Sequence, residues 1–230
     1  MSGVSNSNDT FMIARRNMIE YQIRCCKVLD PDLLDMLASM PREDYVPEHV
    51  RSLAYMEGRV PLPCGQEMHS PLQEATIMQQ LSFTGQDRVL EIGTGSGYLT
   101  NLLALRSGHV TSCDIHAELT RQAEKNLSDH GIDNVTLLNI NAMDESAMQQ
   151  CDSIQGPYDI IVIGTALEKI PAHLRSLLSE SGQLISFTGK NPVLHLIHEA
   201  HANGACTSTT LFETLLQDAE GLPVKRELIF

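Results

Sequence analysis

The sequence predicts an α/β domain with a doubly wound, largely parallel sheet that ends in an antiparallel edge hairpin. Between Asp87 and Asn191, short apolar runs alternate with helical stretches, which is the pattern of βαβ units. After Asn191 the alternation stops. Two apolar stretches then flank Asn203-Gly204, a dipeptide that is favoured in the tight turns of hairpins. These two patterns define the fold class.

Each buried strand is predicted from a short apolar run bounded by turn residues. The expected strands are Arg88–Ile92, His109–Ile115, Val135–Ile140, Tyr158–Ile163 and Gln183–Phe187. The helices expected around them are Tyr98–Arg106, Ala117–His130 and Pro171–Ser179. The hairpin would be formed by Val193–His201 and Ala205–Leu216, although the first of these stretches also suits a helix.

The first 80 residues have a different character and predict a helical extension that ends in an irregular loop. We expect residues 1–80 to form this extension and residues 81–230 to form the ligand-binding domain, joined in one compact unit. The extension should begin with a frayed tail (Met1–Thr10) and a helix (Phe11–Cys26) that has Met12, Ile19 and Ile23 on one face. A second helix (Pro31–Ser39) should be capped by Asp30 and bury a stripe formed by Leu33, Leu34 and Leu37. A proline-rich, irregular stretch (Pro41–Gln66) should follow, with a short helix near His49–Met56.

Composition and charge exclude several classes of partner. The formal net charge of −13 opposes binding to a phosphate backbone, so we expect no nucleic-acid partner. No apolar run reaches the roughly 18 residues of a membrane span, and the polar start of the chain lacks the apolar stretch of a secretory signal. The six cysteines form no CxxC pair. We therefore expect a cytoplasmic protein with no membrane partner.

The strongest chemical signal is a glycine-rich turn between a strand and a helix, Glu91-Ile-Gly93-Thr-Gly95-Ser-Gly97-Tyr98. Glycines there let the backbone turn tightly and let a ligand approach closely. A dinucleotide-binding turn reads GxGxxG/A, and here the bulky Tyr98 occupies the third small position. No Lys-Ser/Thr pair follows, which excludes a P-loop. Asp114 ends the next expected strand, where an acid accepts hydrogen bonds from ribose hydroxyls.

The turn closely resembles the S-adenosylmethionine motif of the protein-L-isoaspartate O-methyltransferases, in the stretch Arg88-Val-Leu-Glu-Ile-Gly-Thr-Gly-Ser-Gly-Tyr98. Further segments resemble the same family in the same order over roughly Met18 to Gly189. They are Met18-Ile-Glu-Tyr-Gln-Ile-Arg24, Met40-Pro-Arg-Glu-Asp-Tyr-Val-Pro-Glu48, Pro61-Leu-Pro with Gly65-Gln66 and Pro71, Pro157-Tyr-Asp-Ile-Ile161, and Ile170-Pro171.

The resemblance implies a seven-stranded, Rossmann-like methyltransferase sheet and S-adenosylmethionine as the methyl donor. It implies that the partner is a protein or peptide with an isoaspartyl residue, whose abnormal α-carboxylate is esterified as a step of protein repair. By position, the residues at the methionine end and around the adenosine are Glu91, Gly93, Thr94, Gly95, Ser96 and Gly97. Asp114 falls at the family's ribose-binding acid, and Asn141-Ala142 falls where an Asp-Gly pair lies beside the adenine.

The acceptor side departs from the family. Aligning Gly65-Gln66 and Pro71 places His69 at the family's active-site Ser, with Ser70 one step later. The C-terminal stretch Thr214–Ala219 also differs from the family's substrate-holding strand. We expect His69 and Ser70 to be the catalytic candidates. His69 is then either a donor that orients a carboxylate or a general base for a neutral acceptor.

Two alternatives to the family's reaction remain open at this stage. One is a diverged relative that methylates another acceptor, and the other is a non-catalytic S-adenosylmethionine-binding protein. No metal site is expected: the HExxH spacing is absent, and in a strand His195 and His198 point to opposite faces.

Overall fold

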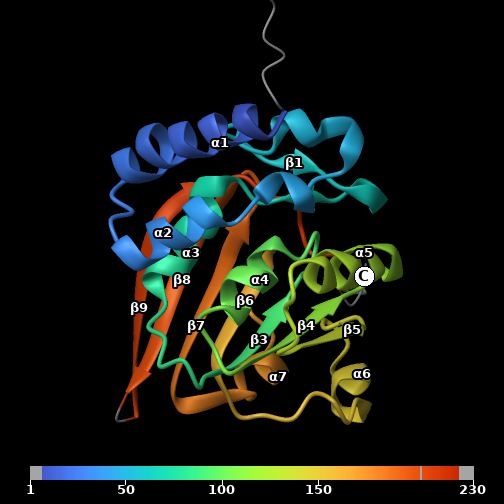
Figure 1. The fold of residues 1–230 in the computed structure, drawn as a ribbon. Helices are drawn as coiled ribbons and strands as arrows, with labels where there is room; N and C mark the ends of the chain where they lie inside the picture. Colours follow the sequence, from blue (N-terminus) through green and yellow to red (C-terminus); the bar gives the residue numbers. More distant parts are fainter. Residues whose placement is uncertain (1–6, 203, 223–230) are drawn as a thin grey trace, which may run out of the picture.

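The computed structural model describes residues 7–202 and 204–222 and contains a seven-stranded mixed sheet with helices on both faces (Figure 1). The strands follow the order β5-β4-β3-β6-β7-β8-β9. Their bounds are β3 (Arg88–Ile92), β4 (His109–Asp114), β5 (Val135–Asn139), β6 (Tyr158–Leu167), β7 (Leu178–Lys190), β8 (Val193–Ala202) and β9 (Ala205–Thr214). The predicted fold class is confirmed: β3 to β7 pair in parallel, and the last two pairings are antiparallel.

Seven α-helices, two short strands and several short helical turns complete the described residues. The α-helices are α1 (Ser7–Met18), α2 (Pro31–Ser39), α3 (Pro71–Gln80), α4 (Tyr98–Ala104), α5 (Ala117–Asp129), α6 (Glu145–Gln150) and α7 (Ala172–Arg175). The other elements are η1 (Ile19–Ile23), η2 (Arg24–Cys26), η3 (Arg42–Tyr45), η4 (Glu48–Leu53), η5 (Pro63–Gly65), β1 (Val60–Pro61) and β2 (Glu67–Met68). No helix among the described residues is long and apolar enough to cross a membrane.

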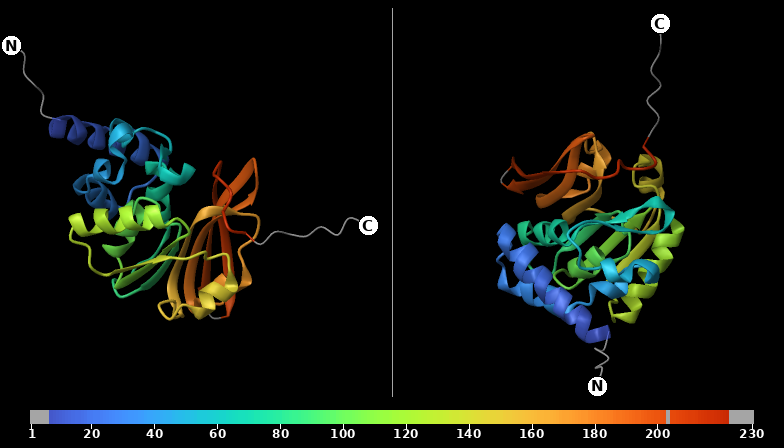
Figure 2. Two further views of the ribbon diagram at one scale, coloured as in Figure 1. Left: turned by 90° about the vertical axis from the view of Figure 1, so that its right-hand side faces the viewer. Right: turned by 90° about the horizontal axis from the view of Figure 1, so that it is seen from above.

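The order of the strands creates a crevice at one edge of the sheet. The chain moves outward from β3 through β4 to β5, and then returns to the other side of β3 as β6. Ligands of open α/β sheets bind at such a switch point, outside the carboxyl ends of the strands. The N-terminal helices lie beyond this edge (Figures 1 and 2). The fold therefore encloses a site between the extension and the sheet.

Alternate residues of each central strand pack on opposite faces of the sheet. Val89 and Val110 belong to the larger apolar core, which also takes in residues from Met18 to Leu216. Leu90 and Ile161 belong to the second core, on the face that carries α6 and α7. The N-terminal extension thus shares one continuous core with the sheet.

The N-terminal helix differs from its expected register. Ile19 and Ile23 are buried as expected, but Met12 is 63% exposed, so its placement on the same face was wrong. The physical reason is the π-turn η1, whose wider turn rotates the following residues relative to α1. Residues 1–6 of the expected frayed tail lie outside the described residues.

The second helix follows its expected pattern, whereas the third was not expected. Asp30 caps α2 by accepting hydrogen bonds from the backbone of Asp32 and Leu33. Leu33 and Leu37 are buried, and Leu34 is half-buried. The unexpected helix α3 begins with a capping box.

The C-terminal part of the sheet contains more strand than the sequence indicated. The stretch Val193–His201 is a strand and not a helix, and it forms the expected hairpin with β9. The predicted helix Pro171–Ser179 is reduced to α7, because β7 already begins at Leu178 and pairs with both neighbours. Asn203 lies outside the described residues, so the predicted turn type stays a prediction.

Candidate active site

The glycine turn after β3 is built from left-handed backbone. Gly93, Gly95 and Gly97 have φ angles of 98°, 54° and 83°, a region that side chains disfavour. Gly97 also precedes α4 at its closest approach to α5: a Cβ atom at this position would lie 3.1 Å from the Cβ atom of Ala123. The glycines therefore shape the turn and let the two helices pack.

Glu91 lies beneath the turn and not on the cleft wall. Its side chain is fully buried, and its Oε2 accepts hydrogen bonds of 2.6 Å from Thr100 Oγ1 and Ser112 Oγ. Ser112 Oγ in turn lies 2.6 Å from Thr94 Oγ1. Burial raises the pKa of Glu91 to about 7. Glu91 is thus connected to the turn through Ser112 and Thr94, and it supports the turn from below.

Asp114 ends β4 directly beside the turn. Its Oδ2 accepts a 2.9 Å hydrogen bond from the backbone N–H of Gly95, and its Oδ1 accepts one of 2.9 Å from the backbone N–H of His116. Burial raises the pKa of this carboxyl. Each oxygen keeps a second lone pair, so the backbone bonds orient the carboxylate and leave it able to accept hydrogen bonds from a ligand.

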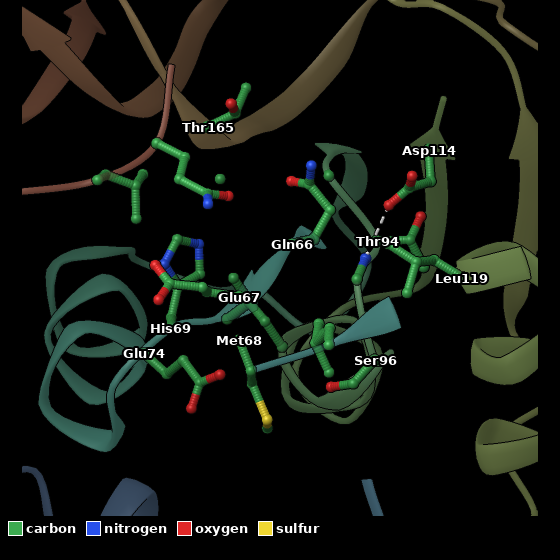
Figure 3. Close-up of a pocket in the computed structure, with 17 residues that line it drawn as sticks. Gln66, Glu67, Met68, His69, Glu74, Thr94, Ser96, Asp114, Leu119 and Thr165 are labelled. Carbon is green, nitrogen blue, oxygen red and sulfur yellow. Dashed lines mark hydrogen bonds between the residues drawn. The ribbon is translucent and has the colours of Figure 1, made fainter. Parts of the chain in front are cut away.

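A cleft opens beside the turn (Figure 3). Figure 3 shows His69 and Glu74 on one side of it and Asp114 and Thr94 on the other. Its lining includes Gln66, Glu67, Met68, His69, Glu74, Gly93, Thr94, Gly95, Ser96, Asp114, Thr165 and Gln217. Of the predicted site residues, the structure therefore brings His69, Asp114 and most of the glycine turn to one space.

A second cavity adjoins the cleft. The two share Gln66, Gly93, Asp114 and Thr165 in their walls. The second cavity is mainly apolar. Its walls include Ile92, Ile115, Ile140 and Met143, together with the predicted cofactor contacts Asn141 and Ala142. Glu91, Gly97 and Ser70 line neither cavity.

The segment Leu215–Leu222, here called the C-terminal strap, crosses both cavities. Gln217 Nε2 donates to the Gly65 carbonyl oxygen over 3.1 Å, and Gln66 Nε2 donates to Glu220 Oε1. Asn141 Nδ2 donates to the Gly221 carbonyl oxygen over 2.9 Å. The strap therefore joins the loop before α3 to the loop after β5.

His69 forms part of the cleft wall on the side opposite Asp114. Its ring stacks on Phe187 with centroids 5.2 Å apart, and its Nδ1 has no hydrogen-bond partner among the described residues. Burial, followed by the charges of Arg42 and Arg59, lowers the pKa of His69 to about 4. The imidazole is therefore neutral at pH 7.

Ser70 has a different role from His69. Its hydroxyl caps α3 by accepting a 3.2 Å hydrogen bond from the backbone of Gln73. This bond holds the hydroxyl at the start of the helix. The structure thus separates the two catalytic candidates: His69 lies on the cleft, and Ser70 positions the helix that follows it.

Several residues of the cleft were not anticipated. Glu74 belongs to α3, which the periodicity did not reveal, and Glu220 belongs to the part of the strap that follows the predicted stretch Thr214–Ala219. The capping-box pattern Ser70-Pro71-Leu72-Gln73 was the available signal for α3. The resemblance marked Thr214–Ala219, but no local signal predicts the contacts of the strap, because they are with residues far away in the sequence.

One cluster in the hairpin has residue types that ligate metals. Side-chain atoms of Glu199, His201 and Cys206 lie within 4.8 Å of one another. However, Arg175 pairs with both carboxylate oxygens of Glu199 at 2.8 Å. A guanidinium in this position competes with a cation for the carboxylate, and we do not assign a metal site there.

Comparison with known proteins agrees with this geometry. The sequence profile of the protein-L-isoaspartate(D-aspartate) O-methyltransferase family matches residues 14–215. The chain belongs to this family. A family member from Protochlamydia amoebophila is 35% identical over 168 residues, which are 73% of this chain and 77% of that protein. Another from Koribacter versatilis is 28% identical over 214 residues, covering 93% of this chain and 91% of that protein.

Solved structures show the same fold. A crystal structure from Plasmodium falciparum that carries this family name, determined with S-adenosyl-L-homocysteine, has a TM-score of 0.74 at 21% identity and covers 90% of this chain and 97% of its own. A second protein-L-isoaspartate O-methyltransferase has a TM-score of 0.72 at 18% identity, over 91% of this chain and 65% of its own.

Proposed function

We infer that this protein is an S-adenosylmethionine-dependent methyltransferase that esterifies the α-carboxyl group of isoaspartyl residues, the reaction for which its family is named. The observation that carries this conclusion is the pair of adjoining cavities, one beside the glycine turn and one after β5, which share Asp114 in their walls. An elongated donor with an amino acid, a sugar and a base matches this sequence of environments.

The residues present fit such a donor. The glycine turn leaves room for the methionine moiety at Gly93–Ser96. Asp114, oriented by two backbone N–H groups, would accept from the ribose hydroxyls. Ala142 and its apolar neighbours would surround the adenine, with the Asn141 amide at the edge. Glu91 and Gly97 would act indirectly, by supporting and packing the turn.

When bound, S-adenosylmethionine supplies an activated methyl group for in-line displacement. The protein's contribution is to hold the acceptor oxygen close to that methyl group and aligned with it. A carboxylate acceptor has a reference pKa of about 4 and is ionised at pH 7, so it needs no general base.

A neutral His69 with a pKa of about 4 is a weak base at pH 7. This property favours a positioning role over proton abstraction, and it agrees with a carboxylate acceptor. We therefore propose that His69 positions the acceptor through Nδ1, which has no hydrogen-bond partner in the described part of the chain.

We place the protein in the cytoplasm, with damaged proteins or peptides as its partners and without nucleic acid. All six cysteines are free, as in a reducing compartment. The net charge of −13 opposes contact with phosphate backbones.

The decisive experiment supplies labelled S-adenosylmethionine with an isoaspartyl peptide and, as a matched control, the same peptide with a normal aspartyl residue. We expect base-labile methyl incorporation into the isoaspartyl peptide alone. Donor binding without transfer would support a non-catalytic binding protein, and transfer to a different acceptor would support a diverged relative.

A further inference from the structure

A second ionisable group lies beside His69 on the acceptor side of the cleft. Glu74 projects from the first turns of α3, is only 2% exposed, and lines the same cleft as His69 and the glycine turn. In Figure 3 its carboxyl group points from α3 into the cleft, below the imidazole ring. None of the donor contacts proposed above uses this group.

A buried arginine fixes the position of Glu74. Arg42 is fully buried and forms an ion pair with Glu74 Oε2 through Nη1. Its Nε donates to the Ala54 carbonyl oxygen over 2.8 Å, its Nη2 donates to the carbonyl oxygen of His69, and its guanidinium lies 4.7 Å from the ring centroid of Tyr98. The guanidinium therefore connects Glu74 to His69, while Glu74 Oε1 forms no hydrogen bond within the described part of the chain.

Charged and titratable groups face Glu74 from each element packed around it. They are Arg42 from η3, the neutral His69 ring from the preceding loop, Glu91 from β3 and the Tyr98 phenol from α4. Burial and the charge of Glu91 raise the pKa of Glu74 to about 7, although Arg42 opposes this shift. Near neutral pH the group therefore exists in both protonation states.

An acceptor carboxylate brought into this cleft would meet Glu74. Two ionised carboxylates in a buried site repel each other, whereas a carboxyl that keeps its proton donates a short, strong O–H···O⁻ hydrogen bond. We propose that Glu74, held by Arg42 beside His69, receives the acceptor carboxylate as a neutral hydrogen-bond donor. This inference rests on the proposed function and names the residue that selects an anionic acceptor.

The proton balance of this step is simple. Acceptor binding above neutral pH takes up one proton from solvent onto Glu74, and the proton remains there during methyl transfer. The ester formed is uncharged, and its oxygen is a weaker acceptor for the Glu74 hydroxyl than the carboxylate was. Release of the ester then allows Glu74 to ionise again.

The test compares the pH profile of kcat/KM for wild-type enzyme and Glu74→Gln on an isoaspartyl peptide. Wild-type kcat/KM should fall about tenfold per pH unit above about pH 7, because only protonated Glu74 accepts the carboxylate. The amide of Glu74→Gln donates at every pH, so its profile should stay flat and exceed wild type at least about tenfold at pH 8.5. Affinity for S-adenosylhomocysteine should be the same in both.

Glu124→Gln is the matched control, because Glu124 is exposed on α5; this variant should keep the wild-type profile. A Glu74→Gln profile that keeps the alkaline decline would overturn the inference, even if the variant melts at a lower temperature. A wild-type rate that rises with pH through neutrality, and a rise lost in Glu74→Gln, would make Glu74 a base and would also overturn it.

Calorimetry in buffers of different ionisation enthalpy gives a second readout that does not depend on how the variant folds. Peptide binding to the wild-type complex with S-adenosylhomocysteine should take up about one proton at pH 8, and no uptake would contradict the proposal.

Failure of the proposed function and failure of the role of Glu74 are distinguishable. If no isoaspartyl peptide is methylated at any pH, the proposed function fails; if methylation occurs without the predicted profile, only the role of Glu74 fails.

Discussion

The proposed donor side and the proposed acceptor side of the cleft are built differently. On the donor side, backbone N–H groups and left-handed glycines dominate, and the Asp114 carboxylate is oriented by Gly95 and His116. On the acceptor side, side chains dominate: His69 and Glu74 are held by the buried guanidinium of Arg42. Backbone geometry therefore determines the shape of the donor side, whereas the identity of the side chains determines the chemistry of the acceptor side. The difference indicates where the chemistry of this protein is specified.

The largest effect should come from removing the central acid of the donor side. Asp114→Ala should weaken binding of S-adenosylhomocysteine about 100-fold, because two charge-assisted hydrogen bonds contribute roughly 3 kcal/mol. Isothermal titration calorimetry measures this directly. The control is Asp133→Ala at an exposed position, which should bind normally; equal affinity of all three proteins would remove Asp114 from the donor site.

Gly97 tests how strongly the turn is constrained by packing. Gly97→Ala should lower the free energy of unfolding by about 2 kcal/mol, because left-handed strain is combined with overpacking. Gly131 has φ +70°, and a Cβ atom added to it would meet nothing within 4 Å, so Gly131→Ala should cost only about 1 kcal/mol. Denaturant titration provides both values, and equal losses would show that the contact with Ala123 is unimportant.

A substitution of His69 should affect the acceptor side of the cleft and leave donor binding unchanged. His69→Ala should reduce kcat/KM for the acceptor about tenfold, the equivalent of one hydrogen bond, with donor affinity unchanged. Because its pKa is lowered to about 4, His69 is neutral at all pH values above about 5, and the ratio of wild-type to variant rates should stay constant from about pH 6 to 9. The exposed His49 provides the control His49→Ala. A ratio that changes with a midpoint near the ordinary histidine pKa of about 6.5 would contradict a neutral positioning role.

The smallest effect is expected at the C-terminal strap. Glu220 accepts from Gln66 and lies 3.4 Å from His116 Nε2, and both of these contacts are partly exposed. Glu220→Gln should therefore increase the dissociation rate of S-adenosylhomocysteine by no more than about threefold, since exposed pairs contribute less than about 1 kcal/mol. Stopped-flow measurement of release tests this, and a change of more than about tenfold would make the strap a principal part of the donor site.

Local patterns explain why the donor side could be predicted from the sequence. The sequence patterns that predict β3, the glycine turn and Asp114 lie in those segments themselves. The strand β3 matches its predicted bounds, Arg88–Ile92. The acceptor side and the C-terminal strap depend on contacts between distant residues. Arg42 meets Glu74 across 32 positions of sequence, and Gln66 meets Glu220 across 154. No periodicity encodes such contacts, which is why Glu74 and the contacts of the strap emerged only from the structure.

A crystal structure with S-adenosylhomocysteine bound tests the central claim most directly. We expect both ribose hydroxyls within hydrogen-bond distance of the Asp114 carboxylate, the adenine in the cavity beside Ala142, and the sulfur facing His69 and Glu74. A ligand bound elsewhere, or with its sulfur directed away from these two side chains, would contradict this assignment of the donor and acceptor sides.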